Sequence, residues 1–231
     1  MRQPHYPPFM TTAQERKQQE RTARRRRIQR AARTVFAEKG YAKTSIEQIA
    51  REASLSVGAI YLYFRSKEDL YVSLLEETLD LFDTELRQIR GRSEVAAPER
   101  LRQAWSFLTQ WAATDVEASR VLRLISQPNI RAQLSDEVVE SVGKGLTQVR
   151  EHLSGIVQDG SQSGVYHRAP QQVVDMFWCL FIGVLESSDA RANLDMPGAS
   201  YAELSQAAFS AIDAAVRTAE GAQPAAAEVA A

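Results

Sequence analysis

The sequence predicts an all-α fold, with a small N-terminal helical domain followed by a larger helical one. Apolar residues recur at the three- and four-residue spacing of a helix along most of the 231 residues, and no segment shows the alternation of a strand. This length suits one small and one larger unit with a buried core. A composition of 44% hydrophobic and 25% charged residues is typical of a globular protein.

Four regions are expected along the chain. The Pro-rich start suggests a flexible tail over residues 1–20, because chain termini are poorly ordered unless they are tied down. The small domain covers residues 21–68 and the larger one residues 69–220. The Ala- and Pro-containing end, residues 221–231, is expected to be disordered.

Nothing in the sequence resembles a secretion signal or a membrane span. Residues 1–13 lack the apolar core of a signal peptide. The longest apolar run, residues 173–185, contains Asp175 and is too short to cross a bilayer. The sequence therefore predicts a cytoplasmic protein without a membrane partner.

Charge is distributed unevenly along the chain. Residues 1–67 hold 15 basic and 5 acidic side chains, a balance of +10, whereas the remainder holds 13 and 24, a balance of −11. A basic end beside an acidic body indicates that a polyanion binds at the N-terminus. The arginine-rich segment before Arg33 is either a solvated helix face or a set of phosphate contacts, and a minor-groove arm is a further alternative.

The strongest local signals lie between Thr44 and Lys67. Thr44 and Glu47 have the spacing of a capping box that opens a short apolar helix. Ser56 can cap a second short helix of small residues, with Ile60 and Phe64 facing inward. Ser66 and Asp69 repeat the capping spacing. Two short helices joined by a tight turn predict a helix-turn-helix that enters a DNA major groove.

The stretch from Arg24 to Leu75 closely resembles the DNA-binding domain of TetR-type transcriptional regulators. The shared features are a Thr-capped helix, a small second helix, a Tyr-x-Tyr-Phe run and a lysine, which are here Thr44, residues 57–59, residues 61–64 and Lys67. Ser54 stands where the family often has glycine, and serine in a left-handed turn carries strain. Ala59 and Leu62 also depart from the family pattern. The resemblance implies a repressor that binds a near-palindromic operator as a homodimer and is released by a small hydrophobic effector.

The helix-turn-helix supplies the expected DNA contacts. Phosphate contacts are expected from Thr44, Ser45, Ser56, Tyr63 and Lys67. Base-edge contacts are expected from Val57, Gly58, Ala59 and Tyr61. The small apolar side chains can read only shape or thymine methyl groups, so Ser45 and Tyr61 should carry the polar readout.

Helices are expected throughout the larger domain. Gly40 ends the first helix of the chain, and a single long helix from Ser66 to Arg90 is expected to join the two domains as a lever. Further helices are expected at residues 101–113, 116–126, 130–158, 171–188 and 200–219.

Aromatic residues of the larger domain are candidates for an effector site. Each one taken alone is more typical of plain core, but an apolar pocket with a few polar groups is the common form of a ligand site. The candidate ligand-binding residues are Trp105, Leu108, Trp111, His152, Phe177, Trp178 and Phe181.

The last two helices are candidates for a dimer interface. Their apolar residues either complete the domain core or, as the resemblance implies, form a four-helix bundle with a second copy. The candidate dimerisation residues are Val173, Phe177, Leu180, Val184, Leu204, Ala208 and Ile212. The lone Cys179 lies in this apolar run and is expected to be buried and inert.

The sequence offers no assembled catalytic or metal-binding motif. None of the His, Cys, Ser or Gly patterns typical of metal sites, hydrolases or phosphate loops occurs, so we expect no enzyme, no metal and no cofactor. A structural, ligand-independent DNA-binding protein of low sequence specificity is the alternative function, and an enzyme with a DNA-binding appendage is a remote one.

Overall fold

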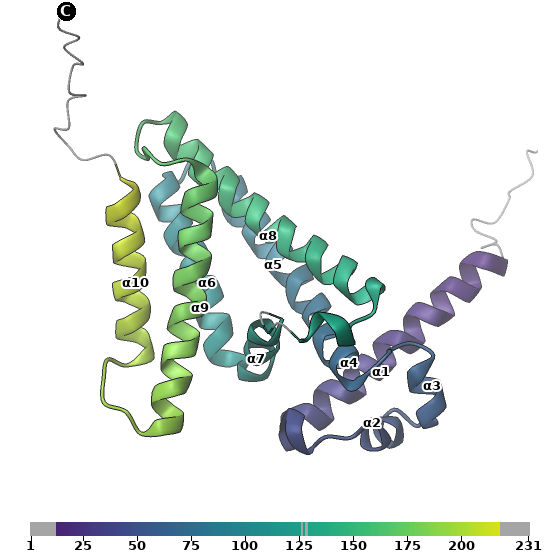
Figure 1. Cartoon of the computed structure of the whole chain (residues 1–231). Helices are drawn as coiled ribbons and strands as arrows, with labels where there is room; N and C mark the ends of the chain where they lie inside the picture. The colour runs from purple at the N-terminus through teal and green to yellow at the C-terminus, as the bar shows by residue number, and fades with distance from the viewer. Residues whose placement is uncertain (1–12, 126, 128, 218–231) are drawn as a thin grey trace, which may run out of the picture. The chain divides into compact units, whose positions relative to one another are not determined.

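The computed structural model describes residues 13–125, 127 and 129–217, and within them the chain is helical (Figure 1). The described residues form no strand, and the only bridge among them is an isolated antiparallel pairing of Tyr166 with Arg217. The all-α prediction is therefore confirmed. None of the described helices is both long and apolar enough to span a membrane. The two expected tails lie largely outside the described residues.

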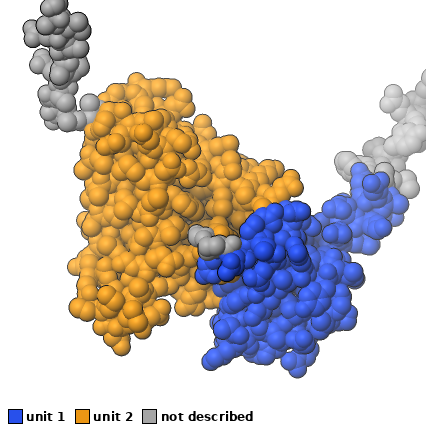
Figure 2. All heavy atoms as spheres, viewed as in Figure 1, with its two compact units in different colours: residues 1–74, 127–138 blue, residues 75–126, 139–231 orange. Residues whose placement is uncertain are grey.

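The chain divides into two compact units (Figure 2). The first unit contains Met1–Leu74 together with Gln127–Val138, and the second contains Leu75–Ser126 and Val139–Ala231. The first unit therefore includes a segment that the sequence placed well inside the larger domain.

The first unit is built from short helices around one apolar core. Its helices are α1 (Ala13–Lys43), α2 (Ile46–Glu52), α3 (Val57–Tyr61), α4 (Lys67–Ser73) and the 3-10 turn η1 (Arg131–Gln133). The core side chains are fully buried, among them Ile28, Phe36, Ile49, Ile60, Phe64 and Leu70. Gly40 interrupts α1 with φ of 73°, as expected for a helix stop. Residues 13–20 are helical, so the expected tail is shorter than predicted.

The predicted continuous helix from Ser66 to Arg90 is wrong, because the helix breaks at Leu74. α4 ends at Ser73 and α5 begins at Leu75. The Gln29 side-chain amide donates to the Ser73 carbonyl at 3.1 Å, and the Arg33 guanidinium donates to the Leu74 carbonyl at 3.0 Å. Since these two carbonyls are held by α1, they are drawn away from the hydrogen-bond ladder of a continuing helix.

The second unit consists of longer helices. They are α5 (Leu75–Gly91), α6 (Ala97–Thr114), α7 (Val116–Leu124), α8 (Asp136–Gln162, whose first turn belongs to the first unit), α9 (Pro170–Leu194) and α10 (Tyr201–Val216). α8 begins six residues later than predicted, because Leu134 is extended and Ser135 caps the helix at Val138 N. Gly145 permits a close approach of α8 to α5, since a Cβ at this position would lie 2.8 Å from the Leu79 Cβ.

Candidate nucleic-acid interface and the effector-domain core

The first helix of the helix-turn-helix is capped by Ser45. The Ser45 hydroxyl accepts from the Gln48 backbone N–H at 3.4 Å, and the Gln48 side chain accepts from the Ser45 N–H at 3.1 Å. The predicted Thr44 cap is therefore wrong by one residue. Thr44 is only 3% exposed, and its hydroxyl donates to the Gly40 carbonyl at 2.9 Å. The sequence carried the correct signal too, as a Ser-x-x-Gln capping spacing.

The turn and the second helix follow the predicted geometry. Ser54 has a positive φ of 52°, so the expected strain is present. Ser56 caps α3 by accepting from the Ala59 N–H at 3.2 Å. Ile60 and Phe64 are buried, and the side of α3 that remains open carries Gly58, Tyr61 and Leu62. Tyr61 is 53% exposed and Leu62 75% exposed, which leaves both side chains available for a partner.

Lys67 is held against α1. Its Nζ donates to the carbonyls of Tyr41 at 3.0 Å and Thr44 at 3.1 Å, and lies 4.2 Å from the centre of the Tyr41 ring. The Tyr41 hydroxyl donates to Glu68. Burial acts to raise the pKa of the Glu68 carboxyl, but this hydrogen bond and others outweigh it and lower the pKa. Lys67 thus has a structural role, and its predicted phosphate contact stays a prediction.

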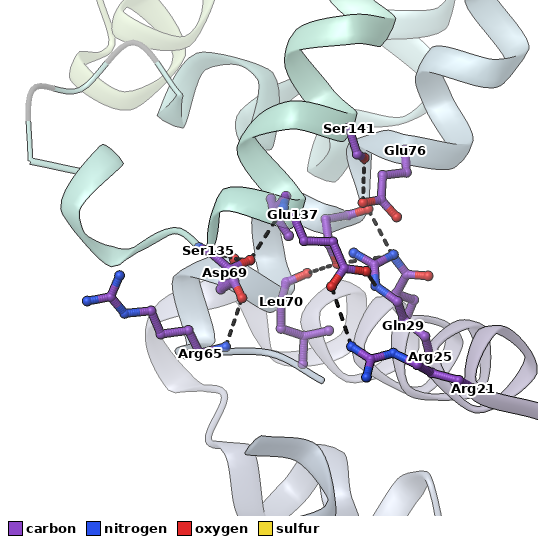
Figure 3. Close-up of polar contacts among 12 residues, drawn as sticks. Arg21, Arg25, Gln29, Arg65, Asp69, Leu70, Glu76, Ser135, Glu137 and Ser141 are labelled. Carbon is purple, nitrogen blue, oxygen red and sulfur yellow. Dashed lines mark hydrogen bonds and ion pairs between the residues drawn. The ribbon is translucent and has the colours of Figure 1, made fainter. Parts of the chain in front are cut away.

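Asp69 joins α4 to the start of α8 within the first unit (Figure 3). Its fully buried carboxylate accepts from the Arg65 N–H at 2.8 Å and from both the N–H and the hydroxyl of Ser135 at 2.9 Å. The Ser66 hydroxyl, in addition, donates to the Gln133 carbonyl at 2.9 Å. The sequence indicated Ser66 and Asp69 only as a local cap, because partners more than sixty residues away leave no local pattern.

Glu137 partly neutralises the basic helix α1 (Figure 3). Its carboxylate lies 3.6 Å from Arg21 and 3.5 Å from Arg25. The guanidinium of Arg21 is 5.7 Å from the centre of the Tyr63 ring, and that of Arg25 is 5.0 Å from the Phe64 ring. These two arginines are therefore positioned by the protein itself, whereas most other basic residues of this helix are exposed.

The candidate effector residues of the second unit are packed against one another. The Trp105 ring meets Phe177 and Phe181 edge-on, with centroids 5.1 Å and 6.3 Å apart, and its Nε1 donates to the Ser205 hydroxyl at 3.0 Å. Trp178 contacts Phe181 at 5.8 Å. All of these except Trp178 are buried, so this cluster forms core.

The other candidate residues lie apart from that cluster. Trp111 packs on Phe82 with centroids 4.7 Å apart, and Leu108 is fully buried. The His152 Nε2 lies 2.8 Å from an Asp83 carboxylate oxygen. On the outer side of Trp105 there is a pocket of about 500 Å³ between α6 and α10, which Thr109, Tyr201, Ser205 and Phe209 also line. No group of three or more His, Cys, Asp or Glu among the described residues is placed to hold a metal.

Most of the candidate dimerisation residues face the protomer's own core. Their exposed fractions are between 0% and 8%, and they are Val173, Phe177, Val184, Ala208 and Ile212. These five already pack within the protomer, whereas Leu180 and Leu204 are half-buried, so the interface assignment stays a prediction. Cys179 is exposed rather than buried. The residues left open on this side, which we call the α9–α10 outer face, are Cys179, Leu180, Gly183, Leu204, Ala207 and Ala211.

The first unit identifies the class of protein. Residues 28–74 match the family model described as bacterial regulatory proteins, tetR family, and they span α1 from its first buried residue to the end of α4. The class is that of helix-turn-helix transcriptional regulators that bind DNA. Within it, residues 28–74 match the TetR family, and two curated relatives match part of the chain.

Two curated relatives extend this match. The HTH-type transcriptional regulator HbdR of Aromatoleum sp. (strain CIB) is 40% identical over 112 residues, 47% of either chain. The fatty acid metabolism regulator protein of Bacillus subtilis (strain 168) is 31% identical over 135 residues, which cover 58% of this chain and 66% of that protein. The chain thus spans about half to two thirds of the length of these relatives.

Solved structures match over most of the chain. The FadR regulator from Bacillus subtilis in complex with stearoyl-CoA has a TM-score of 0.60 and 24% identity, covering 80% of this chain and 96% of that chain. A SmeT–triclosan complex has a TM-score of 0.63 and 19% identity, covering 86% and 93%. At this identity the likeness shows the fold alone, including the helical domain that follows the helix-turn-helix.

Proposed function

We propose that this chain is a repressor that binds a near-palindromic operator as a homodimer and is released by a small hydrophobic effector. The observation that carries the proposal is the open side of α3, where the protein holds the helix by a cap and a buried Ile60 but leaves Tyr61 and Leu62 uncovered. Exposed large side chains on a short capped helix beside a basic α1 suit insertion into a major groove.

The DNA contacts are assigned to the candidate residues that are exposed or half-buried. Val57, Gly58, Ala59 and Tyr61 face base edges, and Tyr61 is the side chain of this group that can donate a hydrogen bond. Ser45, Ser56, Tyr63 and Lys67 lie beside them and contact phosphates. Thr44 leaves this set, because its buried hydroxyl is already used within the protein.

The homodimer forms through the α9–α10 outer face. Its residues are small or apolar, so a second copy can approach closely and make a four-helix bundle. A two-fold axis through this face would present two α3 helices to successive major grooves, about 34 Å apart. The operator is therefore palindromic.

The effector occupies the pocket between α6 and α10. Its volume of about 500 Å³ is that of a site for a small molecule, and Trp105 and Phe209 give it apolar walls beside the polar Thr109, Tyr201 and Ser205. The names of two relatives, a fatty acid metabolism regulator and a stearoyl-CoA complex, make acyl compounds the first class to test. Release requires that the effector bind the non-operator conformation more tightly.

We assign the chain no catalytic activity and place it in the cytoplasm. The relatives are transcriptional regulators, and the described side chains assemble no metal cluster. Its partners are double-stranded operator DNA, the effector and a second copy of the chain.

Operator selection from random duplexes tests the proposal. The protein should enrich a palindrome, and Tyr61→Ala should lose the preference at the positions that Tyr61 reads while still binding DNA. Free fatty acids and acyl-CoAs, added to the complex in a mobility assay, should release it. A protein that coats all sequences equally, with no enriched palindrome and no ligand response, would instead be the structural DNA-binding protein.

A further inference from the structure

The N-terminal half of α1 extends past the core of the first unit as an exposed basic helix (Figure 1). Between Ala13 and Arg27 every residue except Arg25 is exposed, and the first fully buried residue of α1 is Ile28. At 1.5 Å per residue this half is about 22 Å long. The flexible arm considered from the sequence is therefore a helix of fixed direction.

This exposed half is charged in a way that does not favour an isolated helix. Residues 13–27 hold seven basic and two acidic side chains. Lys17, Arg21 and Arg25 follow one another at four-residue spacing, and like charges at that spacing destabilise a helix. Glu137 of the Gln127–Val138 segment pairs with Arg21 and Arg25 of this group. A polyanion lying along the helix would offset the remaining repulsion.

A groove joins this helix to the candidate DNA surface. It has a volume of about 1200 Å³, and its walls include Lys17, Arg21 and Arg24 on α1 and Leu62 and Tyr63 directly after α3. Arg21 stacks over the Tyr63 ring, so the α1 wall and the end of α3 are in contact. The groove is thus continuous with the surface that we assign to base readout.

We propose that this groove holds the DNA backbone outside the base pairs read by α3, so that α1 extends the footprint on each flank of the operator. The proposal rests on the proposed function, because it requires that α3 enter DNA. A length of about 22 Å corresponds to roughly six base pairs at 3.4 Å each. Lys17 and Arg24 contact phosphates there, and the contacts are independent of sequence.

Two double variants on the same helix distinguish the effect of losing cations in the groove from the effect of losing positive charge in general. Lys17→Ala/Arg24→Ala removes two cations from the groove wall. Arg26→Ala/Arg30→Ala removes two exposed cations from the opposite side of the helix, four residues apart and therefore one turn apart on the same face. Each double variant removes two positive charges, so the two variants have the same net charge as each other. Circular dichroism and thermal melting check that both fold like the wild type.

Each protein is titrated with two duplexes over a range of salt concentrations. One duplex ends at the selected operator, and the other carries about twelve extra base pairs on either side. The wild type should bind the long duplex more tightly. The groove variant should lose this gain, with roughly a tenfold loss per missing phosphate contact at 0.1 M salt and a salt slope shallower by about 0.9 per contact. The opposite-face variant should keep the gain.

The outcomes distinguish this proposal from the one on which it rests. Equal affinity of the wild type for both duplexes, or equal losses in the two double variants, would overturn the flank contact while leaving operator recognition intact. A wild type that prefers no operator at all would overturn the proposed function instead.

Discussion

The two units of the molecule are held together in different ways. In the first, short helices are fixed by individual polar bonds: Ser45 on Gln48, Gln29 on Ser73, and Ser135 on Asp69. In the second, long helices meet through a cluster of large rings, Trp105, Phe177 and Phe181, and polar bonds such as Arg100 to Asp159 tie the helices around it. Short helices present few apolar side chains each, so in the first unit the directional bonds carry a larger share of the positioning than they do where long helices pack.

Phe177→Ala should have the largest effect on stability. Phe177 is fully buried against Trp105, so the change removes an aromatic contact and leaves a cavity, at a cost of about 3–5 kcal/mol. Urea unfolding followed by tryptophan fluorescence measures it, since the ring contacts a tryptophan. Leu194→Ala, at an exposed position on the same helix, should be nearly silent. Equal effects at the two positions would show that packing does not dominate the second unit.

Leu180→Glu tests whether the packed unit keeps a separate surface for a second copy. Two uncompensated carboxylates in a dimer interface should raise the dissociation constant about a hundredfold, roughly 3 kcal/mol. The unfolding temperature of the protomer should change little, because Leu180 is half-buried only. Sedimentation over a concentration series measures the dimer, with Gln171→Glu on the same helix as the matched charge control. An unchanged dimer would remove the α9–α10 outer face from the interface.

Asp69→Asn tests the polar bonds of the first unit. The asparagine has one acceptor oxygen in place of two, so at least one of the donors from Arg65 and Ser135 is left buried and unpaired, at a cost of about 2 kcal/mol. Hydrogen exchange in α4 and in the first turn of α8 should speed up together. Asp136→Asn makes the same change at a side chain that is 94% exposed, and its exchange should match the wild type.

Ser54→Gly should have the smallest effect, and in the opposite direction. A non-glycine residue in the left-handed region costs about 1–2 kcal/mol, which glycine would remove. Glycine also loses more conformational entropy on folding, and this offsets part of the benefit, so the net gain in stability is about 0.5–1 kcal/mol. The midpoint of urea unfolding should rise. Ser93→Gly, at an exposed residue that is not among those of positive φ, should lower the midpoint slightly.

Local patterns predicted the first unit well. The Ser56 cap, the Gly40 stop and the inward-facing Ile60 all depend on residues within a few positions, which the sequence displays directly. The break at Leu74 could not be predicted in this way, because it depends on Gln29 and Arg33, more than forty residues earlier. The contact of Asp69 with Ser135 is hidden for the same reason.

Periodicity was less informative in the second unit. It showed that Val173, Phe177 and Val184 must be buried, but a stripe of apolar residues does not say whether its partner is the same chain or another copy. Aromatic content likewise did not separate a packed cluster from a pocket. Trp105 belongs to both: one side of its ring packs against Phe177 and Phe181, and the other side lines a pocket.

The bond between Ser135 and Asp69 means that the helix-turn-helix, with the operator specificity proposed for it, is not a removable cassette. A chimera cut after Leu74 would expose the Asp69 carboxylate and delete two of the three hydrogen bonds that satisfy it. During synthesis, likewise, these bonds cannot close until residue 135 has left the ribosome. Transplanting this specificity onto another scaffold therefore means carrying a second, distant piece of polypeptide along with the helix-turn-helix.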